Sequence, residues 1–136
     1  MLLRVKDWDS WFENSKSRTF KNKSQVSMPN KHGLGYRRLI RMPNGEAMFG
    51  CWCAMVQVLS RQQNRAGWLT ENGKNDANPL GSVEISDITM FSEATCRAML
   101  IACVSEPVGW LIVEGDKDTT RISQGQQKDT VVSPNR

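Results

Sequence analysis

The sequence has few residues suited to catalysis and no segment suited to crossing a membrane. Only one of its 136 residues is a histidine, His32, and it lies in a polar turn with no acid or nucleophile beside it. The N-terminus has no continuous apolar run of the kind found in signal peptides. The longest apolar stretch, residues 48–59, is shorter than the roughly 20 residues that a bilayer span requires. We therefore expect neither export nor membrane insertion.

The spacing of cysteines and glycines argues against two further kinds of site. Cys51 and Cys53 lie about 200° apart around a helix, so a regular helix cannot bring both to one ion. Cys96 and Cys103 are about two helical turns apart, which is not the spacing of a zinc site. Residues 33–35 lack the Gly-Lys-Ser/Thr that completes a nucleotide-binding loop. We predict a non-enzyme without metal or cofactor, whose cysteines are reduced core thiols in a cytoplasmic protein.

Residues 48–59 (MFGCWCAMVQVL) are predicted to be the central core helix. Ten of these twelve residues are apolar and cover most of the helix circumference, which is typical of a helix surrounded by other elements. Asn44 is placed to cap its N-terminus, and Glu46 suits the helix dipole in the first turn. The residues expected at helical spacing on its buried side are Cys51, Trp52, Met55, Val56 and Leu59.

Shorter helices are expected on both sides of this one. Trp8, Trp11 and Phe12 share helical spacing and are interpreted as core residues. Base stacking is the alternative, although three neighbouring acids would repel phosphates. Residues 34–41 are predicted to form a helix with its arginines outward, and Ser82 and Ser92 to cap helices over 83–90 and 93–104. The residues expected to face inward from these three helices are Leu34, Leu39, Ile40, Ile85, Ile88, Cys96, Met99, Leu100 and Cys103.

The β-structure is expected to be small. Residues 2–5 and 24–28 each have the composition of a short strand. The triplet Gly-Trp-Leu occurs at 67–69 and again at 109–111, in two apolar segments that could pair with each other as a small sheet. A capped helix, a turn, a second capped helix and a β-ribbon, all behind a buried helix, indicate a winged helix-turn-helix domain. We therefore predict a mainly α fold with a small β-ribbon (α+β), divided into a basic segment 1–43, a winged-helix core 44–115 and a flexible polar tail 116–136.

Positive charge is concentrated near the N-terminus. Residues 1–41 hold ten of the 18 Lys and Arg but three of the 14 acids, a balance of +7, whereas residues 42–136 have a balance of 8 − 11 = −3. Such a concentration is typical of a protein that binds a polyanion, the alternative being an ordinary solvated surface. Because Lys and Arg bind phosphate by releasing counterions, affinity for DNA should fall steeply with salt. The residues predicted to contact nucleic acid here are Lys16, Arg18, Lys21, Lys23, Lys31, Arg37, Arg38 and Arg41.

The helix predicted over 93–104 carries few groups that read base edges. In a helix-turn-helix the second helix contacts bases through exposed polar side chains, and here only Thr95 and Arg97 are of that kind. The rest of the exposed face is small and apolar, which favours contact with another protein or with a second copy of the chain. The residues predicted for this protein interface are Ala94, Ala98 and Ile101.

A series of short motifs runs in order through residues 2–115. The series comprises Asp7-Trp8-Asp9, Phe12-Glu13-Asn14, Arg18, Pro29-Asn30-Lys31, Gly35-Tyr36-Arg37-Arg38-Leu39, Phe49-Gly50, Trp52, Val56-Gln57-Val58, Gly67, Leu69 and Gly109-Trp110-Leu111. Together these motifs resemble the N-terminal domain of phage and prophage replication-initiation proteins, the replisome organisers related to DnaD-type primosomal proteins.

The resemblance implies a winged-helix domain that binds origin DNA and helps to recruit helicase loading. Family members usually continue into a second domain that contacts the helicase or its loader, so this chain is expected to be a truncated N-terminal domain or a stand-alone relative. We expect a DNA-binding module of phage or prophage DNA replication initiation in the bacterial cytoplasm. Its expected partners are DNA, a second copy of the chain, and a helicase or helicase loader. The alternative class is a protein-interaction or oligomerisation domain of the same fold that binds a host or phage partner.

Overall fold

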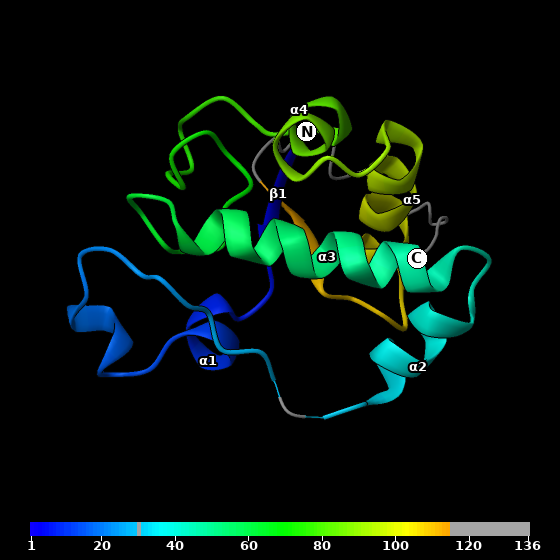
Figure 1. The fold of residues 1–136 in the computed structure, drawn as a ribbon, viewed down its shortest axis with the longest axis horizontal. Helices are drawn as coiled ribbons and strands as arrows, with labels where there is room; N and C mark the ends of the chain where they lie inside the picture. Colours follow the sequence, from blue (N-terminus) through cyan, green and yellow to red (C-terminus); the bar gives the residue numbers. More distant parts are fainter. Residues whose placement is uncertain (30, 115–136) are drawn as a thin grey trace.

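The long helix α3 (Gly45–Ser60) runs through the middle of the molecule, with the other elements arranged around it (Figure 1). The structure is a computed structural model that describes residues 1–29 and 31–114, so the tail predicted over 116–136 lies outside it. Helices and a small antiparallel sheet confirm the α+β class. The other elements in chain order are β1 (Leu2–Val5), α1 (Trp8–Phe12), the 3-10 turn η1 (Ser17–Thr19), α2 (Leu34–Arg41), α4 (Ser82–Thr89), α5 (Glu93–Val104) and β2 (Leu111–Glu114).

The predicted buried side of α3 is confirmed. All five residues expected there are at most 4% exposed and belong to one core cluster with residues from β1, α1, α2, α4, α5 and β2. Asn44 is the N-cap residue, as predicted, but it has a left-handed conformation (φ 62°) and its side chain makes no hydrogen bond to the first turn. Its amide instead donates to Thr95 Oγ1 at 3.3 Å, which joins the start of α3 to the start of α5.

Strand β1 is the centre of the β-structure. It pairs antiparallel with β2, with Leu3 opposite Val113 and Val5 opposite Leu111. On its other edge lies the extended segment 67–70, bonded through Val5 N to Gly67 O (2.8 Å) and through Leu69 N to Leu3 O (2.9 Å). The two Gly-Trp-Leu segments therefore do not pair with each other as expected, because β1 lies between them.

The repeated triplet corresponds to a repeated local structure. Gly67 and Gly109 both have positive φ (87° and 59°), a conformation that glycine adopts without the steric cost a side chain brings. The leucine that follows two residues later is buried in each case, at 1% and 3% exposure for Leu69 and Leu111. Each segment thus begins at a glycine with positive φ, pairs with one edge of β1 and places its leucine in the core. The basic segment 1–43 consequently supplies the strand that both segments flank.

The helix pair α4 and α5 forms as predicted, but several expectations for α4, for α2 and for residues 24–28 are wrong. Ser92 caps α5 by accepting from Thr95 N at 3.1 Å, as expected. The residue at the N-cap of α4 is Gly81 rather than Ser82, and the Glu84 carboxylate accepts from its N–H at 2.7 Å. Leu34 and Ile88 were expected to face inward, but they are 52% and 48% exposed because each lies on the outer side of its helix. The strand predicted over 24–28 is irregular chain.

The cysteines are free thiols, and three of them are buried core residues. Cys51 Sγ on α3 lies 3.6 Å from Cys96 Sγ on α5, so these thiols pack at the contact between the two helices. Burial and the neighbouring thiol of Cys96 raise the pKa of Cys51 to about 12, and burial raises the pKa of Cys103 to about 12.

In residues 1–29 and 31–114, no helix combines the length and the apolar character needed to span a bilayer.

Candidate nucleic-acid interface and aromatic cavity

The fold divides the basic segment between the two ends of α3. Helix α2 lies at the N-terminal end of α3, whereas the segment around η1 lies toward its C-terminal end (Figure 1). Hydrogen bonds from Arg65, which follows α3, to the carbonyl oxygens of Ser17 (2.9 Å) and Phe20 (3.2 Å) fix that second position. The eight basic residues predicted as one nucleic-acid surface are therefore not gathered on one surface.

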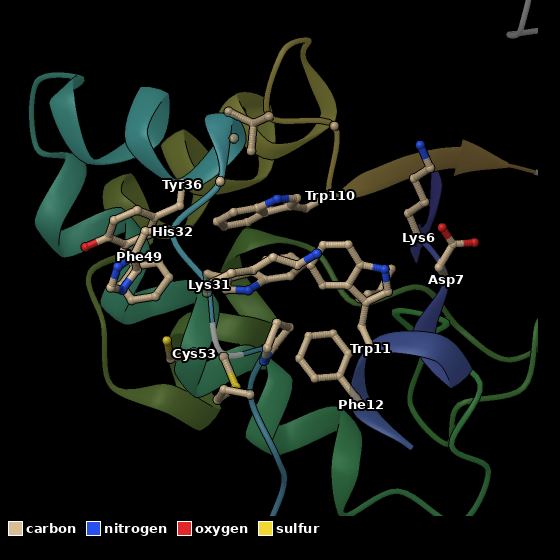
Figure 2. Close-up of a pocket in the computed structure, with 18 of the residues that line it drawn as sticks. Lys6, Asp7, Trp11, Phe12, Lys31, His32, Tyr36, Phe49, Cys53 and Trp110 are labelled. Atoms are coloured by element: carbon tan, nitrogen blue, oxygen red, sulfur yellow. The ribbon is translucent and has the colours of Figure 1, made fainter. Parts of the chain in front are cut away.

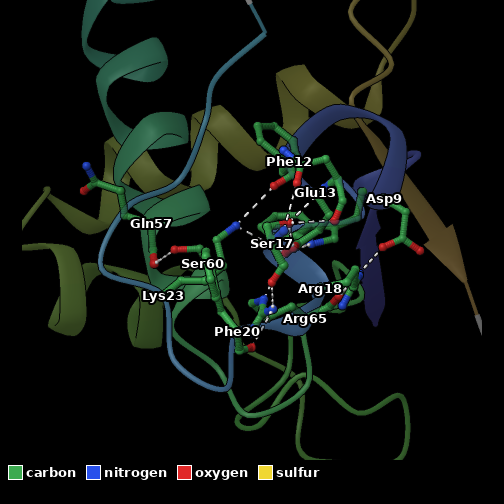
Figure 3. Close-up of polar contacts among 12 residues, drawn as sticks. Asp9, Phe12, Glu13, Ser17, Arg18, Phe20, Lys23, Gln57, Ser60 and Arg65 are labelled. Atoms are coloured by element: carbon green, nitrogen blue, oxygen red, sulfur yellow. Dashed lines mark hydrogen bonds and ion pairs between the residues drawn. The ribbon is translucent and has the colours of Figure 1, made fainter.

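Around η1, one buried carboxylate binds two cations. Glu13 Oε2 lies 3.0 Å from Arg65 Nε and 3.4 Å from Lys23 Nζ, and the three side chains are 1%, 6% and 5% exposed (Figure 3). Trp8 Nε1 donates to the same oxygen at 3.0 Å, and Ser17 Oγ donates to Oε1 at 2.7 Å. Lys23 was predicted to contact nucleic acid. That expectation is wrong for this side chain, because it is buried and paired with Glu13.

The hydrogen bonds and charges around Glu13 favour its ionised form. Burial on its own raises the pKa of this carboxyl. Hydrogen bonds from Ser17, Trp8 and Arg65 and the charge of Lys23 outweigh burial, so the pKa of Glu13 lies below its ordinary value. The cluster is thus a charged structural unit that ties the irregular chain after α1 to residue 65.

The other basic residues of this region differ in exposure and pairing. Arg18 forms an ion pair with Asp9 and donates to the Arg65 carbonyl, so its charge already has a partner (Figure 3). Lys16 and Lys21 are exposed. Of the four basic residues between 16 and 23, these two remain as candidates for phosphate contact.

Helix α2 presents three arginines to solvent on one stripe. Arg37, Arg38 and Arg41 are exposed, as predicted, while Leu39 on the opposite side is fully buried. Their spacing of i, i+1 and i+4 places them on one side of the helix, together with exposed Leu34. Within the described part of the chain, none of the three takes part in an ion pair. We call Arg37, Arg38 and Arg41 the arginine stripe.

Helix α5 has no unpaired basic side chain in the described structure, because its one basic residue, Arg97, forms an ion pair. Arg97 is exposed but pairs with Glu93, whose pKa is lowered by the hydrogen bond from Ser82 and by Arg97. Thr95 is half-buried next to Asn44, and so lies beside the turn that follows α2. On the predicted protein interface, Ala94 and Ile101 are exposed, whereas Ala98 packs against the core.

A cavity of about 570 Å³ opens between α1, α2 and the segment before β2. Figure 2 shows Trp110 on one side of it and Trp11 and Phe12 on the other. Tyr36, Phe49 and Trp52 complete the aromatic wall, and Lys6, Asp7, Lys31 and His32 also line it. We call this the aromatic cavity. Its walls come from five separate segments, so sequence patterns do not predict this cavity; the only signal is the large number of tryptophans, five in 136 residues.

His32 and the potential metal ligands are poorly placed for catalysis or metal binding. His32 is exposed and packs its ring on Tyr36, with centroids 4.6 Å apart. Among residues 1–29 and 31–114, no three His, Cys, Asp or Glu side chains are grouped so as to hold a metal ion. The arrangement therefore offers exposed arginines for anions and an aromatic cavity for flat or apolar groups.

Comparison with protein-family models, curated proteins and solved structures finds no match to this chain.

Proposed function

We propose that this chain is a DNA-binding module of the winged-helix type that acts in phage or prophage replication initiation in the bacterial cytoplasm. The observation that carries the proposal is the arginine stripe, three exposed cations on one side of α2 without an acidic partner among the described residues. Unpaired exposed arginines bind phosphates by releasing condensed counterions. The role in replication initiation, with a helicase or helicase loader as a further partner, rests on the resemblance of the motifs.

The order of the elements supports a winged-helix type of fold. Helix α3, the extended segment 67–70, α4, α5 and β2 follow one another, and α4 and α5 pack on each other and on α3. The ribbon is made by β1 and β2, which come from the two ends of the described chain. The buried helix and the helix pair thus follow the expected order, whereas the ribbon is completed by β1 from the start of the chain and not by the segment before α4.

The first turn of α5 lies beside the turn between α2 and α3. The hydrogen bond between Asn44 and Thr95 joins α5 to this turn, and the N-terminus of a helix favours phosphate groups. Phosphate contacts position a protein on DNA without reading its sequence. We therefore expect binding that is strong at low salt and weakly sequence-dependent, with the arginine stripe as its main contact.

Fluorescence anisotropy across a salt series tests the proposal. A labelled 20-base-pair duplex and its single strand are titrated with wild type and with Arg37→Ala/Arg38→Ala. Loss of two phosphate contacts should lower the steepness of log K against log salt by about 2 and weaken binding at 50 mM salt by tenfold or more. The matched control is Arg61→Ala/Lys74→Ala, which removes the same charge from exposed residues beyond the other end of α3. Equal weakening by both variants, or no binding by wild type at 50 mM salt, would refute the proposal.

A second candidate function, self-association, is favoured by exposed apolar residues on the helix pair. Ile88, Met90 and Ile101 are 48%, 85% and 62% exposed. Ile101→Glu should separate a dimer without loss of helix content, as measured by light scattering and circular dichroism. Ala98 is unsuitable for this test because it packs against the core, so a charge there would disturb folding. A wild type that is monomeric at 100 μM would exclude this function.

A further inference from the structure

The two walls of the aromatic cavity differ in how firmly they are held. On one side, ring contacts link His32 to Tyr36, Tyr36 to Phe49, Phe49 to Trp110 and Trp110 to Trp52, with centroids 4.6, 5.1, 6.3 and 5.0 Å apart. Trp52 is 4% exposed and anchors this wall in the core. Such a connected set of rings presents a fixed aromatic surface to the cavity.

The opposite wall carries a tryptophan, Trp11, that does not belong to the hydrophobic core. Trp8 and Phe12 of α1 are buried, but Trp11 between them is 41% exposed. The ammonium of Lys31 lies 5.5 Å from the centre of the Trp11 ring, within range of a cation–π interaction. Trp11 therefore stands at the mouth of the cavity with a cation over its face (Figure 2).

The acids near Trp11 do not repel an anion as the sequence suggests. Three acids neighbour the tryptophan in sequence, and this argued against base stacking. In the structure, Asp9 pairs with Arg18, and Glu13 pairs with Arg65 and Lys23. Asp7 also lines the cavity, but Lys6 and Lys31 line it too, so the charged side chains of the lining sum to a positive charge. The mouth of the cavity is thus suited to a ligand that combines a flat ring with negative charge.

The cavity and the arginine stripe are continuous. Leu34, in the first turn of α2, lines the cavity and is 52% exposed. Arg37, Arg38 and Arg41 follow on the same side of the helix, so the stripe extends about 10 Å from the cavity mouth at a rise of 1.5 Å per residue. A chain of phosphates can follow this stripe while a base attached to it enters the cavity.

We propose that the aromatic cavity receives an unpaired base of single-stranded DNA, whose neighbouring phosphates lie on Lys31 and the arginine stripe; this rests on the proposed DNA-binding function. Base and aromatic side chain stack through their faces, which tolerates any base and adds to phosphate contact. Duplex DNA keeps its bases stacked inside the helix, so the cavity gives a preference for single strands. The base enters between Trp11 and the fixed wall that contains Trp110.

The experiment compares two probes that share phosphates but differ in bases. One is (dT)12, and the other is a strand of twelve abasic sugar-phosphate units. Both are titrated by anisotropy at 50 mM salt with wild type, Trp11→Ala, Trp11→Phe and Phe20→Ala. Phe20 is the matched control, since its ring is 46% exposed and lies outside the cavity.

We expect wild type to bind (dT)12 about tenfold more tightly than the abasic strand, a stacking contribution typical of one base. Trp11→Ala should remove this difference and leave binding of the abasic strand unchanged, while Trp11→Phe and Phe20→Ala retain most of it. Equal binding of the two strands by wild type would overturn the cavity proposal and leave phosphate binding intact. Binding of neither strand would overturn the DNA-binding function as well.

A measurement on wild type keeps the proposal testable if the Trp11 variants misfold. Cys53 lines the cavity and is half-buried, whereas the other three cysteines are fully buried. We expect (dT)12, but not the abasic strand at equal occupancy, to slow modification of Cys53 by N-ethylmaleimide at least fivefold, as followed by mass spectrometry. Protection by both strands or by neither would contradict base entry into the cavity.

Discussion

Basic residues at the two ends of α3 are used in opposite ways. Near its C-terminal end, Lys23 and Arg65 are buried against Glu13, and each also donates to a backbone carbonyl, Lys23 to that of Phe12 at the end of α1 and Arg65 to that of Ser17 in η1. Near its N-terminal end, Arg37, Arg38 and Arg41 lie in solvent without a partner in the described residues. The first set holds the fold together, whereas the second is free to bind.

The difference shows that charge summed over a segment does not locate a binding surface. Residues 1–41 have a balance of +7, yet Lys23 is neutralised in the interior and Arg18 is paired at the surface. Buried cations require a counter-charge because desolvation is costly, while exposed arginines are stable without one. The burial and pairing of each residue therefore decide whether it stabilises the fold or is available to a polyanion.

The largest expected effect comes from removing the carboxylate of the buried set. Glu13→Gln keeps the shape of the side chain but leaves two buried cations without a counter-charge. We expect a loss of about 3–5 kcal/mol in the free energy of unfolding, measured by urea denaturation. Arg37→Ala/Arg38→Ala, at the other end of α3, should change stability little because those residues are exposed. Similar losses of stability for both variants would show that the buried and the exposed basic residues contribute alike to the fold.

Low pH should destabilise the fold through the same cluster of Glu13, Lys23 and Arg65. The pKa of Glu13 is lowered in the folded chain, so its contribution to stability is complete above its unfolded pKa of about 4.3 and is lost as the pH falls through the lower folded value. Urea midpoints measured from pH 7 to pH 3 should therefore fall below about pH 4 in wild type. The decline should be shallower in Glu13→Gln, and an identical decline in both would show that other carboxyls are responsible.

Short-range patterns in the sequence predicted most of the helices, including the buried side of α3 and the Ser92 cap of α5. These patterns could not predict the buried ion pair between Glu13 and Arg65, because the two residues lie 52 positions apart and neither residue type is normally buried. For Leu34 and Ile88, an apolar residue on a short helix was assigned to the core although it faces outward. The aromatic cavity could not be predicted because it exists only once α1, α2 and Trp110 are brought together.

Lys21 and Lys23 are close in sequence, but we expect their replacement to differ in its effect on stability. Lys23→Met removes one of the two cations of Glu13 and the bond to the Phe12 carbonyl, and should cost about 1–3 kcal/mol of stability without changing DNA affinity. Lys21→Met, two residues earlier on the surface, should leave stability unchanged. Urea denaturation and anisotropy on both variants measure this. A fall in DNA affinity for Lys23→Met alone, with stability intact, would mean that Lys23 reaches the ligand.

The variant with the smallest predicted change frees the charge of Arg18 from its ion pair with Asp9. Asp9→Asn removes the carboxylate that pairs with Arg18, an exposed ion pair that contributes little to stability. The freed charge should raise affinity for (dT)12 a few-fold at 50 mM salt and steepen the salt dependence by at most about 0.7, the slope for one phosphate of a single strand. Asp76→Asn is the control, because it changes the net charge equally at an exposed position without an ion pair in the described chain. If the affinity for (dT)12 rises equally in the two variants, the change in net charge explains the increase. A gain confined to Asp9→Asn would show that pairing with a carboxylate is what keeps Arg18 from binding.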